Sequence, residues 1–122
     1  MPRRRWTERT IGAPAYTYRM LRSLHEHHEA IGTLCSRFHV KTLYVFGSAA
    51  TDEYDPRSSD IDFLVEFLPV ERHGFKDVYF QLLDALESLL GRRVDLVEST
   101  AVRNPHFKTS IESTKVALYA AA

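Results

Sequence analysis

The sequence predicts an α/β (α+β) domain, in which helices flank a small mixed sheet. Two kinds of apolar periodicity alternate along its 122 residues. Apolar residues recur every three or four positions in some segments, as in helices, and every second position or in short runs in others, as in strands. The resulting order is helix, strand, loop, strand, helix, strand, helix, and this order is typical of a mixed sheet covered by helices.

The N-terminal region divides into a basic tail and a helix. Residues 1–14 include Arg3, Arg4 and Arg5 and show no sustained periodicity, so we expect a disordered tail followed by a single domain over residues 15–122. From Ala15 the pattern predicts one amphipathic helix, which would suit pairing into a homo- or hetero-oligomer. Its apolar face consists of Met20, Leu21, Leu24, His28, Ile31, Leu34, Cys35 and Phe38.

Two strands and a polar loop follow. Residues 42–46 form an aromatic and β-branched run that ends at Gly47, which predicts a buried strand. Residues 49–59 predict a loop, with or without a short helical turn. Residues 60–67 predict a second strand, in which Ile61 and Phe63 face the core while Asp60 and Asp62 face away from it.

The C-terminal half contains the clearest helix. Residues 75–90 carry a broad apolar stripe, and Gly91 follows where a helix commonly needs a residue with positive φ. Residues 94–97 predict a third strand. Asn104 and Pro105 have the pattern of an N-cap followed by proline at the first helical position, so a helix to about residue 114 and an extended segment over 116–119 are expected. We expect the following aromatic residues to lie in the core: Phe38, Tyr44, Phe46, Phe63, Phe67 and Phe80.

Composition excludes several classes of protein. The net charge is zero, so no global field indicates nucleic acid or a membrane surface. Cys35 is the single cysteine, and neither a membrane-length apolar run nor a signal-peptide h-region is present, so we expect a cytoplasmic protein. The segment His25 to Glu29 is not a His-Glu-x-x-His motif, and we expect a solvated helix face there rather than a metal site.

Three aspartates indicate a cation site. Asp60 and Asp62 share one face of the second predicted strand, and Asp95 points away from the core in the third. Neighbouring carboxylates repel each other unless a cation lies between them, and Mg²⁺ prefers such oxygen ligands. If the two strands are neighbours, the three carboxylates converge, which is sufficient to hold two Mg²⁺ ions for phosphoryl chemistry. Gly47 and Ser48 directly follow the first strand, where backbone N–H groups and a hydroxyl can bind phosphate.

Phe46-Gly47-Ser48, a polar gap and then Ser59-Asp60-Ile61-Asp62 resemble the Gly-Ser…Asp-x-Asp signature of the DNA polymerase β-type nucleotidyltransferases. The small size resembles the minimal nucleotidyltransferase (MNT) branch of that superfamily, and residues 92–97 resemble the strand that bears its third carboxylate. The resemblance implies that Asp60 and Asp62 bind the ion at the triphosphate of ATP. Asp95 would join at the second ion and act as general base, and Gly47 and Ser48 would hold the β- and γ-phosphates. The loop after Ser48 lacks the basic residue and glycine that the family often has there, and Arg57 and Lys41 are the candidates to replace them.

The same resemblance implies a partner. Small domains of the MNT branch commonly pair with HEPN-domain proteins as toxin–antitoxin modules, and the MNT protein is thought to neutralise the toxin by attaching AMP to a tyrosine. We therefore expect an antitoxin that adenylylates a HEPN-family toxin and does not need nucleic acid. Two alternatives stay open: a catalytically degraded antitoxin that acts by binding alone, and a nucleotidyltransferase for an aminoglycoside-like small molecule.

Overall fold

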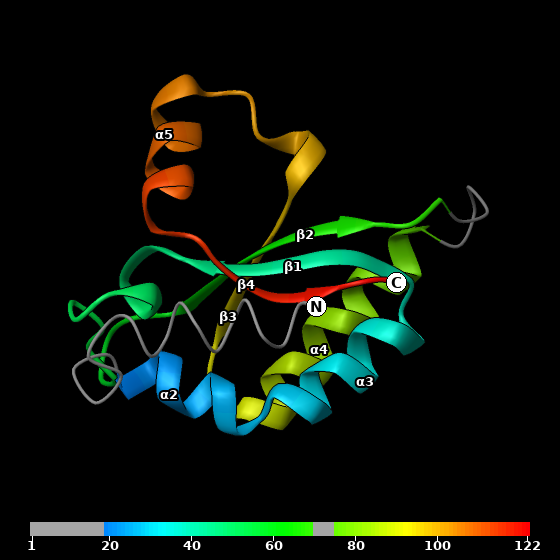
Figure 1. The fold of residues 1–122 in the computed structure, drawn as a ribbon, viewed down its shortest axis with the longest axis horizontal. Helices are drawn as coiled ribbons and strands as arrows, with labels where there is room; N and C mark the ends of the chain where they lie inside the picture. The colour runs from blue at the N-terminus through cyan, green and yellow to red at the C-terminus, as the bar shows by residue number, and fades with distance from the viewer. Residues whose placement is uncertain (1–18, 70–74) are drawn as a thin grey trace.

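A computed structural model describes residues 19–69 and 75–122, and it has the predicted α/β architecture (Figure 1). The predicted tail over residues 1–14 lies outside the described residues. The strands are β1 (Val40–Phe46), β2 (Ile61–Phe67), β3 (Val94–Glu98) and β4 (Val116–Ala120). The α-helices are α2 (Arg19–Glu26), α3 (His28–Arg37), α4 (Phe75–Leu90) and α5 (Pro105–Thr114), and short 3₁₀ turns form η1 (Gly47–Ala50) and η3 (Ser99–Ala101).

The four strands form one mixed sheet in the order β3-β2-β1-β4. β1 pairs antiparallel with both β2 and β4, whereas β2 and β3 are parallel and are connected through α4. A parallel pair needs a long crossover, and α4 supplies it. The predicted second and third strands are therefore neighbours, which is the arrangement that the carboxylate site requires.

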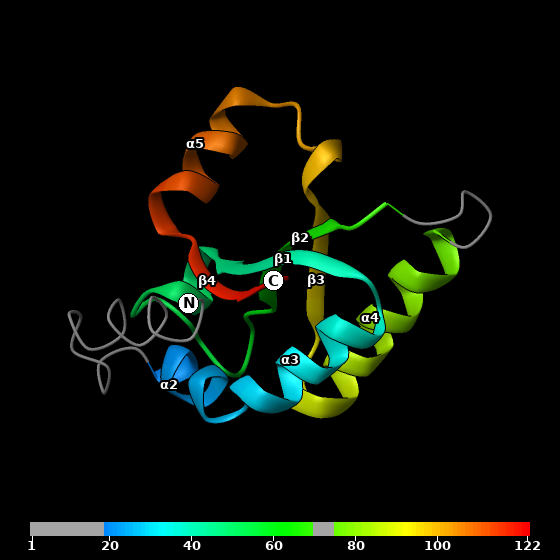
Figure 2. The same ribbon diagram turned by 45° about the vertical axis from the view of Figure 1, so that its right-hand side comes forward.

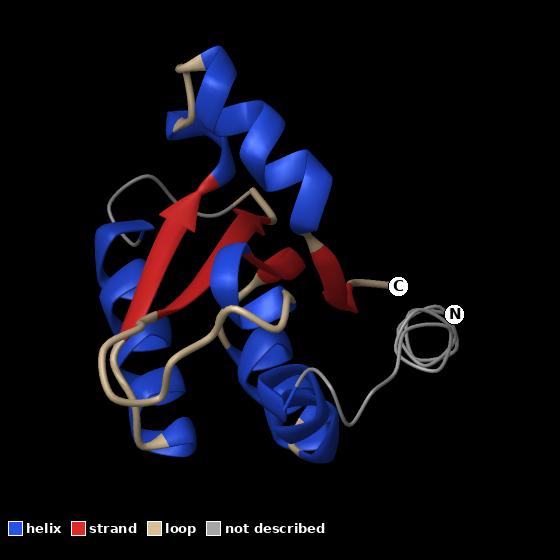
Figure 3. Cartoon of the chain, turned by 90° about the vertical axis from the view of Figure 1, so that its left-hand side faces the viewer, coloured by secondary structure: helices blue, strands red, loops and turns tan. Residues whose placement is uncertain are grey.

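The hydrophobic core lies between the sheet and the helices α2, α3 and α4, which cover one face of it (Figure 3). The predicted alternation in β2 is confirmed, because Ile61, Phe63 and Val65 are fully buried while the residues between them are only partly buried. Leu24, Ile31 and Cys35 complete the core from the helical side. Within the described ranges, no helix combines the length and apolar character needed to cross a membrane.

The other side of the sheet carries α5, which Figures 1 and 2 show apart from the three core helices. Ile111 of this helix is buried, and Phe107 of the same helix packs edge-on against Phe46 with ring centroids 5.8 Å apart. Since Phe46 lies at the end of β1, this contact fixes α5 over the outward face of the sheet at the end where Asp60 and Asp62 lie.

Two helix boundaries follow the local signals in the sequence. Gly91 ends α4 with φ of +64°, and its N–H donates to the Glu87 carbonyl, as predicted for a glycine C-cap. Asn104 caps α5, because its side-chain oxygen accepts hydrogen bonds from the N–H groups of His106 and Phe107. Pro105 then occupies the first helical position, where no N–H is needed.

The prediction of one continuous N-terminal helix is wrong, because the helix breaks at His27. The rings of His27 and His28 hydrogen-bond the carbonyls of Ser23 and His25, so these side chains compete for backbone acceptors at the break. Within this segment His25, His27 and His28 are partly buried, whereas Glu26 and Glu29 are exposed, as expected for a solvated face. The placement of Phe80 in the core is also wrong: its side chain is 55% exposed, because α4 turns Tyr79, Leu82 and Leu86 inward instead.

Candidate active site

Asp62 and Asp95 lie side by side on neighbouring strands. The two residues are direct partners in the parallel register of β2 and β3, so their side chains leave the sheet on the same face. On the other side of β2, Asp62 is paired with Phe46, the last residue of β1. The sheet therefore brings two of the predicted carboxylates to the end of β1, directly before the Gly47–Ser48 turn.

Gly47 is shaped to accept the Asp62 carboxylate. Its φ of +70° lies in the left-handed region, which favours glycine. A Cβ atom at this position would come within 2.8 Å of Asp62 Oδ2. Both the backbone conformation and the space for the carboxylate thus require glycine, and the turn and Asp62 form one site.

The Asp62 carboxylate is destabilised in its charged form. Partial burial, followed by repulsion from Asp95 and Asp60, raises the pKa of Asp62 from 3.8 to about 6. Asp95 and Asp60 therefore lie near enough to Asp62 for their negative charges to repel its own. A group of carboxylates held together against their own repulsion is typical of a cation or phosphoryl-transfer site.

Asp60 lies directly before β2 and contacts a base that sequence reasoning did not assign to the site. Arg93 Nε lies 3.2 Å from Asp60 Oδ1, and the Arg93 carbonyl accepts the N–H of Ile61, which joins the starts of β2 and β3. Asp60 Oδ1 is shielded from solvent but has no well-aligned hydrogen bond. Because the Arg93 side chain is 77% exposed, the ion pair contributes little stability and can exchange for another cation.

The donor set suits Mg²⁺, which prefers carboxylate oxygens combined with phosphate oxygens. Positive charge would be stabilising here, because Asp60 Oδ1 attracts Arg93 without a well-aligned hydrogen bond and the raised pKa of Asp62 shows that its charged form is disfavoured. Among the described residues, however, no three acidic, histidine or cysteine side chains already form a complete metal-binding group. Substrate phosphate would therefore have to supply part of the coordination.

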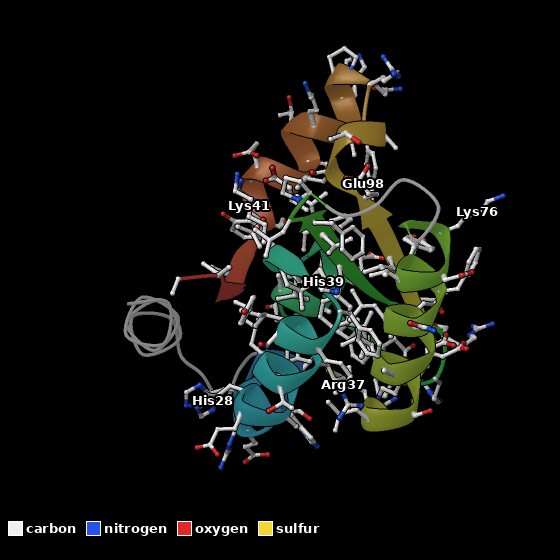
Figure 4. All side chains as sticks on the ribbon, turned by 90° about the vertical axis from the view of Figure 1, so that its right-hand side faces the viewer. His28, Arg37, His39, Lys41, Lys76 and Glu98 are labelled. Carbon is white, nitrogen blue, oxygen red and sulfur yellow. The ribbon has the colours of Figure 1, made fainter. Side chains whose placement is uncertain are left out.

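The loop after Ser48 lacks the basic residue that the family often has there. Its predicted replacements, Arg57 and Lys41, lie away from the carboxylates. Arg57 is 92% exposed and is paired with Asp55 in the loop, with Nε 3.6 Å from Asp55 Oδ1. Lys41, which is labelled in Figure 4, lies near the start of β1 and is paired with Glu66. Six residues of strand, about 20 Å, separate it from Gly47. Within the described part of the chain, Arg93 is the base that is ion-paired with a carboxylate of the candidate site.

Thr114 is a second residue of this site that sequence reasoning missed. Its hydroxyl oxygen accepts a hydrogen bond from the Gly47 N–H at 2.9 Å. The two residues are separated by 67 positions, and no local pattern links them. The last turn of α5 thereby joins the Gly47–Ser48 turn and the carboxylates in one site.

Comparison with known proteins places this geometry in a family. A family model described as a nucleotidyltransferase domain matches residues 28–118. The Methanocaldococcus jannaschii protein named "Putative protein adenylyltransferase MJ0128" is 43% identical over 79 residues, which cover 65% of this chain and 76% of the relative. A second M. jannaschii protein of that kind, MJ1379, is 39% identical over 79 residues, covering 65% of this chain and 77% of that protein.

Two solved structures have the same fold. One is described as a "putative minimal nucleotidyltransferase" and superposes with a TM-score of 0.64 at 30% identity, covering 78% of this chain and 92% of the other. The other is a chain from the complex of a tri-AMPylated Shewanella oneidensis HEPN toxin with an MNT antitoxin. It superposes with a TM-score of 0.56 at 19% identity, and the match covers 80% of this chain and 73% of that one.

Proposed function

Because this chain belongs to the nucleotidyltransferase domain family, we propose that it transfers AMP from ATP to a hydroxyl group of a protein acceptor, in a reaction that depends on Mg²⁺. The proposal rests mainly on the pairing of Asp62 with Asp95 on the parallel strands β2 and β3. Gly47 lies beside this pair, and its lack of a side chain leaves room for the Asp62 carboxylate. Relatives named as protein adenylyltransferases support the choice of AMP and of a protein acceptor.

Each residue of the candidate site has its own proposed role. Asp60 and Asp62 would hold the metal ion at the triphosphate, Asp95 would join them at a second ion, and Gly47 and Ser48 would bind the β- and γ-phosphates. When bound, the two Mg²⁺ ions would supply charge neutralisation at the phosphates. Arg57, which lies in the loop that leads to Asp60, is proposed to reach the triphosphate only when nucleotide is bound.

Asp95 is proposed to accept the proton of the acceptor hydroxyl. The acceptor oxygen then forms a bond to the α-phosphorus of ATP, and the bond from that phosphorus to the pyrophosphate oxygen breaks. Exposure of Asp95 at the surface suits this role, because an acceptor on another protein can reach it. Most of the rate enhancement would come from positioning and electrostatic stabilisation.

We further propose that the acceptor belongs to a HEPN-family toxin and that this chain is its antitoxin, acting in the cytoplasm. The structural likeness to a chain from a complex that contains an AMPylated HEPN toxin supports this choice of partner. A protein acceptor also suits a site in which the Asp95 side chain is exposed on the outward face of β3.

The test is transfer of label from [α-³²P]ATP to a HEPN-domain protein encoded beside this chain's gene. Asp62→Asn and Asp95→Asn are expected to reduce transfer at least 100-fold, as removal of groups that stabilise a transition state does. Asp84→Asn, an exposed acid in the middle of α4, is the matched control and is expected to match wild type. The proposal fails if label never reaches the partner although the partner is neutralised equally well by wild type and the Asp62 variant.

That last result would favour the alternative of an antitoxin that acts by contact alone. Two observations give this alternative its basis: Asp60 is already paired with Arg93, and the Gly47 N–H is already bonded to Thr114. Label that reached an aminoglycoside-like acceptor and not the protein would instead indicate a small-molecule nucleotidyltransferase.

A further inference from the structure

The Gly47 backbone is held by a side chain from the C-terminal part of the fold. Its N–H donates to Thr114 Oγ1 at 2.9 Å. Thr114 is the last residue of α5, and β4 begins two residues later at Val116, which is paired with Val45 of β1. The end of α5 is therefore fixed beside the point at which β1 passes into the Gly47–Ser48 turn.

The Thr114 hydroxyl donates one hydrogen bond and accepts another. A hydroxyl has one proton and two lone pairs, and Thr114 donates its proton to the Ser110 carbonyl at 3.0 Å. Only acceptor capacity remains to face the turn, and the Gly47 N–H uses it. Without this oxygen, the partly buried Gly47 N–H would lose its acceptor, which is unfavourable.

We propose that Thr114 is a positioning residue for the triphosphate. It holds Gly47 so that Ser48 presents its hydroxyl and N–H to phosphate while the Asp62 carboxylate keeps its place against the glycine. The inference rests on the proposed function, because it assigns the turn to Mg·ATP. Since the Gly47 N–H is bonded to Thr114, phosphate contacts fall mainly to Ser48, and Thr114 acts through the turn without touching the substrate.

Three variants separate this role from a general effect on α5. Thr114→Val keeps the size and branching of the side chain but removes the acceptor, and Thr114→Ser restores it. Thr109→Val is the matched control, because the Thr109 hydroxyl makes the same type of bond within the helix, to the Pro105 carbonyl at 3.0 Å, but is exposed. Each variant is titrated with Mg·AMP-PNP by calorimetry, and exchange of the Gly47 amide hydrogen is followed by NMR without nucleotide.

Thr114→Val is expected to weaken Mg·AMP-PNP binding about fivefold, equivalent to about 1 kcal/mol, and to speed exchange at Gly47. Thr114→Ser and Thr109→Val are expected to match wild type in both measurements. Unchanged or tighter binding by Thr114→Val, or an equal loss in Thr109→Val, would overturn the role of Thr114. Failure of the wild-type protein to bind Mg·AMP-PNP would instead refute the proposed function, so the two failures are distinguishable.

Discussion

Replacing Asp62 with asparagine is predicted to stabilise the metal-free protein while it removes activity. Partial burial and the charges of Asp95 and Asp60 raise the pKa of Asp62 from 3.8 to about 6. If the whole shift acted on folding, ionised Asp62 would lower the free energy of unfolding by about 3 kcal/mol. Because Asp62 is only half-buried, solvent screening reduces the expected gain to about 1–2 kcal/mol. Asparagine keeps the shape of the side chain and removes the charge.

The pH dependence of this gain has a definite sign. Between pH 3.8 and about 6 the folded protein binds the Asp62 proton more tightly than the unfolded chain does, so the contribution of Asp62 to stability falls as pH rises through that window. The advantage of Asp62→Asn should therefore be small below pH 4 and complete above pH 7.

Urea denaturation followed by circular dichroism, in buffer with EDTA, measures this difference at pH 4.5 and at pH 7.5. Asp84→Asn, on the exposed side of α4, should shift the free energy of unfolding by less than about 0.5 kcal/mol at either pH. Added Mg²⁺ with AMP-PNP should stabilise wild type and not Asp62→Asn. A variant less stable than wild type at pH 7.5 in EDTA, or a difference that does not change with pH, would refute the reasoning.

Three further substitutions test how the site and its neighbouring helices are built. Alanine at Gly47 and alanine at Gly91 should each cost about 1–2 kcal/mol of stability, because both positions have positive φ. Only Gly47→Ala also displaces the Asp62 carboxylate, so calorimetry should show at least tenfold weaker Mg·AMP-PNP binding for it and unchanged binding for Gly91→Ala, around which the space is open. Equal binding by the two variants would contradict the proposed contact between turn and carboxylate. Asn104→Ala should lower the free energy of unfolding in urea by about 1 kcal/mol, since two N–H groups lose their cap, and a cost near zero would show that the cap is dispensable.

Local signals explain how much of the fold could be predicted. The stripe in α4 ends at Gly91, and Asn104 with Pro105 starts α5, so these boundaries depend on a few adjacent residues. Alternation in β2 predicted which face carries Asp62 because strand geometry leaves only two faces. The break at His27 was missed because it depends on which carbonyl each imidazole reaches, and an apolar pattern does not contain that information.

The parts of the site that were missed depend on contacts between distant segments. Arg93 could have been suggested from its place beside the third strand, but its pairing with Asp60 needed the register of β2 with β3. Thr114 carries no motif, and its contact with Gly47 exists only because β4 returns to pair with β1. The outward direction of Asp62 and Asp95 was predictable, because a charged residue in a buried strand must face away from the core.

The separation of 67 positions between Gly47 and Thr114 also matters during synthesis. A growing chain can form β1 and β2 early, but the Gly47 N–H has its acceptor only after α5 has left the ribosome. Contacts across such long separations close slowly, because the loop entropy must be lost first. Tight nucleotide binding is therefore expected only late in folding, and its appearance would show that α5 has packed against the Gly47–Ser48 turn.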